Sequence, residues 1–183
     1  ERSRGLGDVY KRQKLYCGYF DRQKPDGTMS LGIKNVKELV QKLKQENENL
    51  LDPNEPLAGW GLDPIYFDDK AIDRKMLDVV SDQRPIGILH ASGHKLNINS
   101  VGLKLAGFLR TGINHEGLPL GDDGLPSGEI RGAETIALVT RHVGLGKDWL
   151  SGDAEGLRNF GKICARAGVT TAADLANLQQ DEA

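Results

Sequence analysis

Long apolar runs, paired cysteines and an excess of charge of one sign are all missing from this chain of 183 residues. No apolar stretch approaches the ~20 residues of a membrane-spanning helix, so no membrane span is expected. The net charge is −2, and no basic cluster falls on one predicted face, which argues against a dedicated nucleic-acid binder. Cys17 and Cys164 have neither the spacing of a thiolate metal site nor the number needed for a disulfide framework.

Apolar and charged residues are present in the proportions of a folded domain. Hydrophobic residues make up 38% of the chain and charged residues 27%, so the chain can bury a core. Its length allows one domain or at most two. Glycine is abundant, with 23 residues against 2 Trp, 4 Tyr and 4 Phe, and this excess predicts plentiful loops.

The first thirteen residues differ from the rest of the chain. They show no apolar periodicity and no apolar core of the kind that defines a signal peptide. The segment Asp8 to Gln13 is what a transposase-type sequencing adapter encodes when it is read in frame. We therefore expect residues 1–13 to be an adapter artefact and the natural protein to extend further upstream, which leaves its cellular location open. A natural, solvated basic arm is the alternative.

Helical patterns recur along residues 14–183. Asn35 is expected to cap a helix in an Asn-x-x-Glu box with Glu38, because apolar residues follow at helical spacing. Shorter helices are predicted after Asp73 and after Asn99 or Ser100. Two further helices are indicated by these residues: Ile136, Val139 and Val143 for the first, and Leu157, Phe160, Cys164 and Ala167 for the second, which Gly168 ends.

Strands and loops separate these helices. Residues 84–90 predict a buried strand, and residues 169–174 predict a short strand at the end of the chain. Residues 59–64 are expected to form a loop, because Gly and Pro dominate there. Residues 112–128 are turn-rich, with a hairpin tip at residues 122–124. Alternating helices and strands predict an α/β fold.

Two histidines flank a loop that follows the predicted strand. His90 and His94 have the spacing of two helical zinc ligands, but Ala91, Ser92 and Gly93 between them argue against a helix. We instead expect His94 to face a ligand, since α/β proteins bind ligands at the carboxyl ends of strands. Asn99 begins the next helix, whose free N–H groups are expected to point into the same space. The alternatives are a loop histidine satisfied by the backbone and an asparagine that only caps its helix.

Other candidate sites have simpler explanations. Gly-rich residues 59–61 and 117–128 show neither a GxGxxG nor a Walker pattern, so nucleotide binding is not expected. Several acidic residues are candidate general bases or metal ligands, although a solvated hairpin tip explains them as well: Asp122, Asp123, Glu129 and Glu134.

A series of short motifs occurs in an order typical of one enzyme family. The motifs are Leu77-Asp78, Arg84-Pro85, His90-Ala91-Ser92-Gly93-His94, Asn99-Ser100, Leu105-Ala106-Gly107 and Pro126-Ser127-Gly128-Glu129. With them the chain resembles amidohydrolase family 3, which includes enzymes similar to N-substituted formamide deformylase. The similarity covers residues 59–174 well and residues 14–50 loosely.

The resemblance implies the architecture and chemistry of a longer parent protein. Family members have a metal-dependent (β/α)₈ barrel and a small β-sandwich. Residues 14–183 would be mainly the insertion between the first and second barrel strands, together with the start of the second. The parent would use a divalent metal, zinc being the first candidate, to hydrolyse C–N bonds of a small-molecule substrate. His94 and Asn99 are the expected substrate-binding residues. No oligomeric state is predicted.

The chain also departs from the family pattern. Members carry a His-x-His pair on the first barrel strand, and this sequence has none. We therefore expect the catalytic residues and metal ligands to lie outside it, and the isolated chain to be inactive. Where many relatives have a second acid after the Pro-Ser-Gly motif, this chain has Gly132. The alternative from another class is a self-contained, non-enzymatic binding module.

Overall fold

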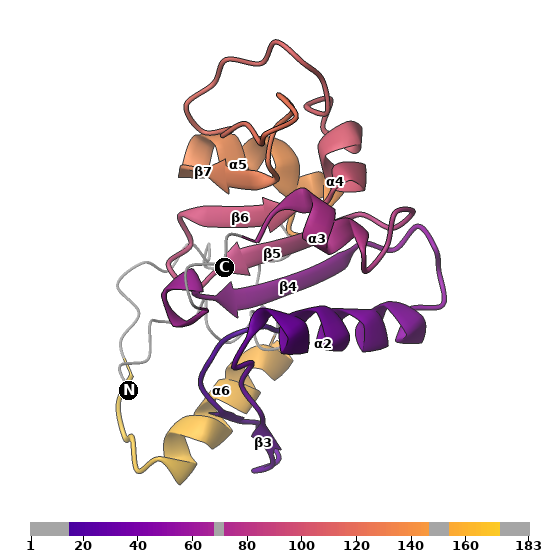
Figure 1. Cartoon of the computed structure of the whole chain (residues 1–183). Coiled ribbons are helices and arrows are strands. Elements are labelled where there is room, and N and C mark those ends of the chain that lie inside the picture. Colours follow the sequence, from indigo (N-terminus) through magenta and orange to yellow (C-terminus); the bar gives the residue numbers. More distant parts are fainter. Residues whose placement is uncertain (1–14, 68–71, 147–153, 173–183) are drawn as a thin grey trace.

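The computed structural model describes residues 15–67, 72–146 and 154–172, and its centre is a mixed five-stranded sheet (Figure 1). The strand order is β1-β4-β5-β6-β7. Their bounds are β1 Leu15–Tyr16, β4 Leu57–Leu62, β5 Ile86–His90, β6 Lys95–Ile98 and β7 Glu129–Arg131. Strands β1, β4 and β5 are parallel, whereas β5, β6 and β7 pair in antiparallel fashion. A separate hairpin consists of β2 (Arg22–Gln23) and β3 (Met29–Ser30).

Helices cover both faces of this sheet. The helices of the described residues are α2 Val36–Asn49, α3 Arg74–Asp78, α4 Ser100–Leu105, α5 Ala133–Val139 and α6 Ala154–Arg166, with 3₁₀ turns η1 Pro64–Tyr66 and η2 Thr140–His142. One hydrophobic cluster joins α2 and α3 to the sheet, and a second joins α4 and α5 to the opposite face. Strands β4 and β5 are buried along their whole length, as is typical of strands covered on both sides. The predicted α/β class is confirmed.

Three of the predicted helix starts are confirmed by their caps. The Asn35 side chain accepts a hydrogen bond from the Glu38 backbone N–H at 2.9 Å. The Glu38 carboxylate accepts from the backbone N–H of Lys34, one residue before the cap. Asp73 and Asn99 cap α3 and α4 in the same way. Local side-chain hydrogen bonds therefore fix these boundaries, and they can be recognised from the sequence.

The predicted loop at residues 59–64 is wrong, because residues 57–62 form β4. Its glycines serve close packing: a Cβ on Gly59 would lie 2.8 Å from the Cys17 sulfur, and one on Gly61 2.7 Å from the Tyr16 ring. Gly61 also has φ +89°, next to an irregularity in the β4–β5 register. The sequence could not separate a loop glycine from one that admits a neighbouring side chain.

The end of the chain differs in part from the prediction. Helix α6 ends at Arg166, and the predicted stop residue Gly168 follows it with φ +72°. The Gly168 N–H donates to the Ala165 carbonyl at 3.1 Å. Residues 169–172 do not form the predicted strand and have no ladder partner among the described strands. Residues 173 and 174, like the predicted adapter segment 1–13, lie outside the described residues.

The turn-rich segment contains the predicted hairpin tip. Leu120 and Pro126 form an antiparallel bridge, and the Gly121 N–H donates to the Leu125 carbonyl at 2.8 Å.

No helix within the described ranges is long and apolar enough to cross a bilayer.

Candidate functional site

Three parallel strands end at the same edge of the sheet, here named the carboxyl edge. It contains Cys17 after β1, Asp63 after β4 and His90 at the end of β5. Backbone hydrogen bonds connect the strands there: the Cys17 N–H donates to the Trp60 carbonyl at 2.7 Å and the Ala91 N–H to that of Leu62 at 2.8 Å. Because α/β proteins bind ligands at such an edge, it is the first candidate site.

His90 lies at the carboxyl edge but is buried within the sheet, with 4% of its surface exposed. Its Nε2 is 2.5 Å from the Asn97 side-chain oxygen, and the Asn97 amide nitrogen donates to the Ile72 carbonyl at 2.6 Å. Because the Asn97 amide nitrogen donates to Ile72, the Asn97 atom that faces His90 is the side-chain oxygen. The His90 Nε2 therefore carries a proton and donates it.

Burial lowers the pKa of His90 below its ordinary value of 6.5, although the hydrogen bond to Asn97 and the charge of Glu129 act in the opposite direction. The neutral ring is thus the form that the fold accommodates. Protonation would place a charge in the sheet with little solvent around it. The structure gives His90 a packing and hydrogen-bonding role.

The lowered pKa of His90 predicts that the protein becomes less stable in mild acid. Below about pH 6.5, His90 binds a proton in the unfolded chain but stays neutral in the folded chain. The free energy of unfolding therefore decreases as the pH falls, by up to ~1.4 kcal/mol per pH unit. Urea unfolding between about pH 8 and 5.5 measures this slope. His90→Gln, which keeps a donor for Asn97, should flatten the curve. An unchanged slope would assign the effect to another group such as His142, whose pKa burial also lowers.

His94 lies in the turn that joins β5 to β6. The predicted loop is present, but it leads into an antiparallel strand rather than a helix. Gly93 adopts φ +75° in this turn. The side chain of His94 is exposed, while its backbone N–H donates to the Ser92 hydroxyl at 3.3 Å and its carbonyl accepts from Gly132 at 3.1 Å. An exposed ring on a backbone anchored on both sides is available to a ligand.

Asn99 lies at the opposite end of β6 and is completely buried. Its side-chain oxygen accepts from the N–H groups of Ile86 and Gly102, each at 3.0 Å, and its amide donates to the carbonyls of Ser81 and Arg84 at 3.0 and 2.8 Å. The expectation that Asn99 and His94 face one space is wrong, because the length of β6 separates them. Their substrate-binding roles remain predictions.

Two of the four candidate carboxylates, Asp123 and Glu129, are held in separate ion pairs. Hydrogen bonds from Lys75 and Arg74 keep the pKa of Asp123 at about 2. Burial opposes ionisation of Glu129, yet Arg131 at 2.5 Å and Lys95 at 3.4 Å lower its pKa. Asp122 and Glu134 are exposed.

None of these groups forms a metal centre. Within residues 15–67, 72–146 and 154–172, no three His, Cys, Asp or Glu side chains are close enough together to hold an ion. The described residues therefore do not fit the metal that the family resemblance implies.

Two buried arginines that were not candidate site residues connect distant parts of the chain. Arg74 donates from Nε to the Pro126 carbonyl at 3.0 Å and from Nη1 to the Ser100 hydroxyl at 3.2 Å, and it pairs with Asp123. Arg84 donates to the Asn47 side chain and to three backbone carbonyls near the end of α2: Leu50, Asp52 and Glu55. Their partners are about 25 to 50 residues away in sequence, so no local pattern could reveal them.

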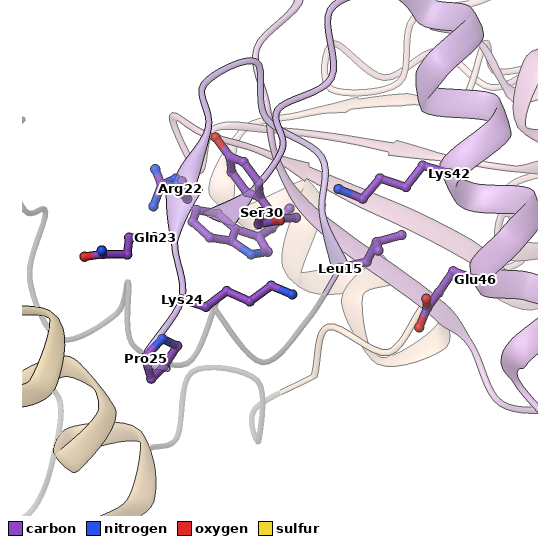
Figure 2. Close-up of a pocket in the computed structure, with 10 residues that line it drawn as sticks. Leu15, Arg22, Gln23, Lys24, Pro25, Ser30, Lys42 and Glu46 are labelled. Carbon is purple, nitrogen blue, oxygen red and sulfur yellow. The ribbon is translucent and has the colours of Figure 1, made fainter. Parts of the chain in front are cut away.

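The sequence also showed no sign of a pocket at the β1 edge of the sheet. It has a volume of about 390 Å³ and lies along the edge strand β1, between α2 and the β2–β3 hairpin (Figure 2). Its lining comprises Leu15, Tyr16, Arg22, Gln23, Lys24, Pro25, Ser30, Lys42, Glu46 and Trp60. We refer to it as the basic pocket. These residues come from five elements or their flanks, which only the fold brings together.

Comparisons with known proteins give a match at the level of structure. No protein-family model and no curated protein matches the sequence. An uncharacterized metal-dependent hydrolase from Pyrococcus horikoshii OT3 is similar over 90% of this chain and 33% of its own, with 14% identity and a TM-score of 0.50. Another from Pyrococcus furiosus covers 90% and 34%, with 14% identity and a TM-score of 0.46.

The match to the Pyrococcus horikoshii protein is a match of fold. This chain spans about a third of the length of that hydrolase. Its mixed sheet with helices on both faces thus corresponds to part of a larger hydrolase structure. The position within a barrel, and membership of amidohydrolase family 3, remain predictions.

Proposed function

We propose that this chain is part of a metal-dependent hydrolase that resembles amidohydrolase family 3 and cleaves C–N bonds in small amide-like molecules. The observation that carries the proposal is the fold: nine-tenths of the chain matches one third of a metal-dependent hydrolase. The motifs from Leu77 to Glu129 support it independently, because they are a pattern of sequence rather than of structure.

In this proposal the chain contributes to the substrate side of the site. It is an insertion between the first two strands of a (β/α)₈ barrel, and residues of the parent outside this chain hold the divalent metal, with zinc as the first candidate. The ring of His94 is exposed on a turn whose backbone is bonded to Ser92 and Gly132, so it is suited to orient an amide or a carboxylate. Asn99 acts from further away, by tying the start of β5 to the start of α4.

The test begins with the flanking DNA. Amplification from the source DNA should replace residues 1–13, continue beyond Ala183, and reveal a His-x-His pair upstream and further His and Asp ligands downstream. The full-length protein should then retain about one to two zinc ions per chain after dialysis and hydrolyse N-substituted formamides or simple amides. Removal of the metal with a chelator should abolish the hydrolysis, and zinc should restore it.

Two results would contradict the proposal. The first is a natural start and stop codon around the present sequence, which would favour the self-contained binding module. The second is a full-length protein that hydrolyses none of these substrates with its metal bound.

A further inference from the structure

The basic pocket gathers positive charge around an apolar floor. Among the described residues of its lining, Arg22, Lys24 and Lys42 are the cationic side chains and Glu46 is the one carboxylate. In Figure 2 Lys24 extends from the hairpin side and Lys42 from α2, and both point into the space between them. Among the described residues, no carboxylate lies within 4 Å of the Lys24 or the Lys42 ammonium group. Two such groups at one space repel each other unless an anion lies between them.

The floor of the pocket is aromatic. The rings of Tyr16 and Trp60 are 5.3 Å apart, and the Arg22 guanidinium lies 4.8 Å from the centre of each. Trp60 has 3% of its surface exposed and belongs to the core of the sheet. Arg22 is thus held by the two rings. The Lys42 ammonium lies 5.9 Å from the centre of the Tyr16 ring, and Lys42 and Lys24 are the cations that reach into the open part. Leu15 and Pro25 add apolar surface.

We propose that the basic pocket binds a small organic anion, one that carries a carboxylate or a phosphate on a compact apolar body. The volume of about 390 Å³ falls in the range of small-molecule sites. The anionic group lies between Lys24 and Lys42, and the apolar body packs towards Leu15 and the Tyr16 ring. A lysine binds either anion as a point charge, so the geometry suits both groups. This inference does not depend on the proposed hydrolase function.

Calorimetric titration of the 183-residue chain tests the proposal with matched compounds. Benzoate and phenyl phosphate present the two anionic groups on one ring, benzamide removes the charge, and inorganic phosphate removes the ring. We expect saturable binding of benzoate or phenyl phosphate with one site and a Kd below about 1 mM. Benzamide and inorganic phosphate should each bind at least about tenfold more weakly, since each lacks half of the recognised chemistry. The tighter of the two ring anions identifies the preferred group.

Variants then locate the site. Lys42→Gln should raise the Kd at least about fivefold. Lys24→Gln should have the same effect, and because Lys24 lies on the exposed hairpin turn, its result cannot come from a folding defect in α2. Lys44→Gln is the control, because it removes the same charge from the same helix at an exposed position outside the pocket. It should change the Kd less than about twofold. The proposal is overturned by a lack of saturation with either anion at about 10 mM, by equal binding of benzamide, or by equal losses in all three variants.

Discussion

Replacement of Asn99 by alanine is expected to lower the free energy of unfolding by about 3 kcal/mol. Its completely buried side chain makes four hydrogen bonds that join the start of β5, the start of α4 and the segment around Ser81 and Arg84. The substitution would leave two N–H groups and two carbonyls of the backbone, most of them buried, without the partners they have now. Urea unfolding of the chain measures the loss.

Asn35 provides the matched control. It is also an N-cap asparagine whose side-chain oxygen accepts a helix N–H, but it is exposed and its amide binds the Glu38 side chain. Asn35→Ala should cost about 1 kcal/mol, the usual value of a cap. Asn99→Asp should be nearly as harmful as Asn99→Ala, because it places a carboxylate oxygen against the carbonyls of Ser81 and Arg84. Equal costs for Asn99→Ala and Asn35→Ala would show that Asn99 acts as a cap alone.

Replacement of His94 by alanine should have the opposite pattern, with activity lost and stability kept. In the full-length enzyme we expect kcat/KM for amide hydrolysis to fall more than about tenfold, or ~1.4 kcal/mol. The thermal midpoint and the metal content should stay near those of the unmodified enzyme, since the ring is exposed and the substitution leaves the backbone hydrogen bonds of the turn in place. Steady-state kinetics, thermal unfolding and metal analysis on the same preparations check all three.

The variant Ser92→Ala distinguishes an effect of the His94 imidazole from an effect of the turn conformation. It removes the hydroxyl that accepts the His94 backbone N–H but keeps the ring. If the ring contacts substrate, Ser92→Ala should reduce kcat/KM much less than His94→Ala. Similar losses in the two variants, or a loss of activity that follows a loss of stability, would make His94 a structural residue of the turn.

Local chemistry in the sequence determined much of the secondary structure. The caps at Asn35, Asp73 and Asn99, the apolar run that becomes β5 and the glycine that ends α6 each act within a few residues of the chain. Side-chain caps, apolar periodicity and left-handed glycine are short-range effects, so they can be read along the chain. The turn that carries His94 was found for the same reason.

Tertiary packing decided what these elements do. Gly59 and Gly61 lie in a strand because β4 pairs with β1 and β5, and they are glycines because Cys17 and Tyr16 pack where a Cβ would stand. His94 and Asn99 are held apart because residues 95–98 pair as a strand with β5 and β7, and strand pairing depends on partners that are distant in sequence. The basic pocket likewise exists only after β1, β4, α2 and the β2–β3 hairpin meet. The sequence by itself determined the capped starts of α2, α3 and α4 and the turn after β5, because these depend on neighbouring residues. Long-range contacts determined which glycines lie in strands and which side chains share a site.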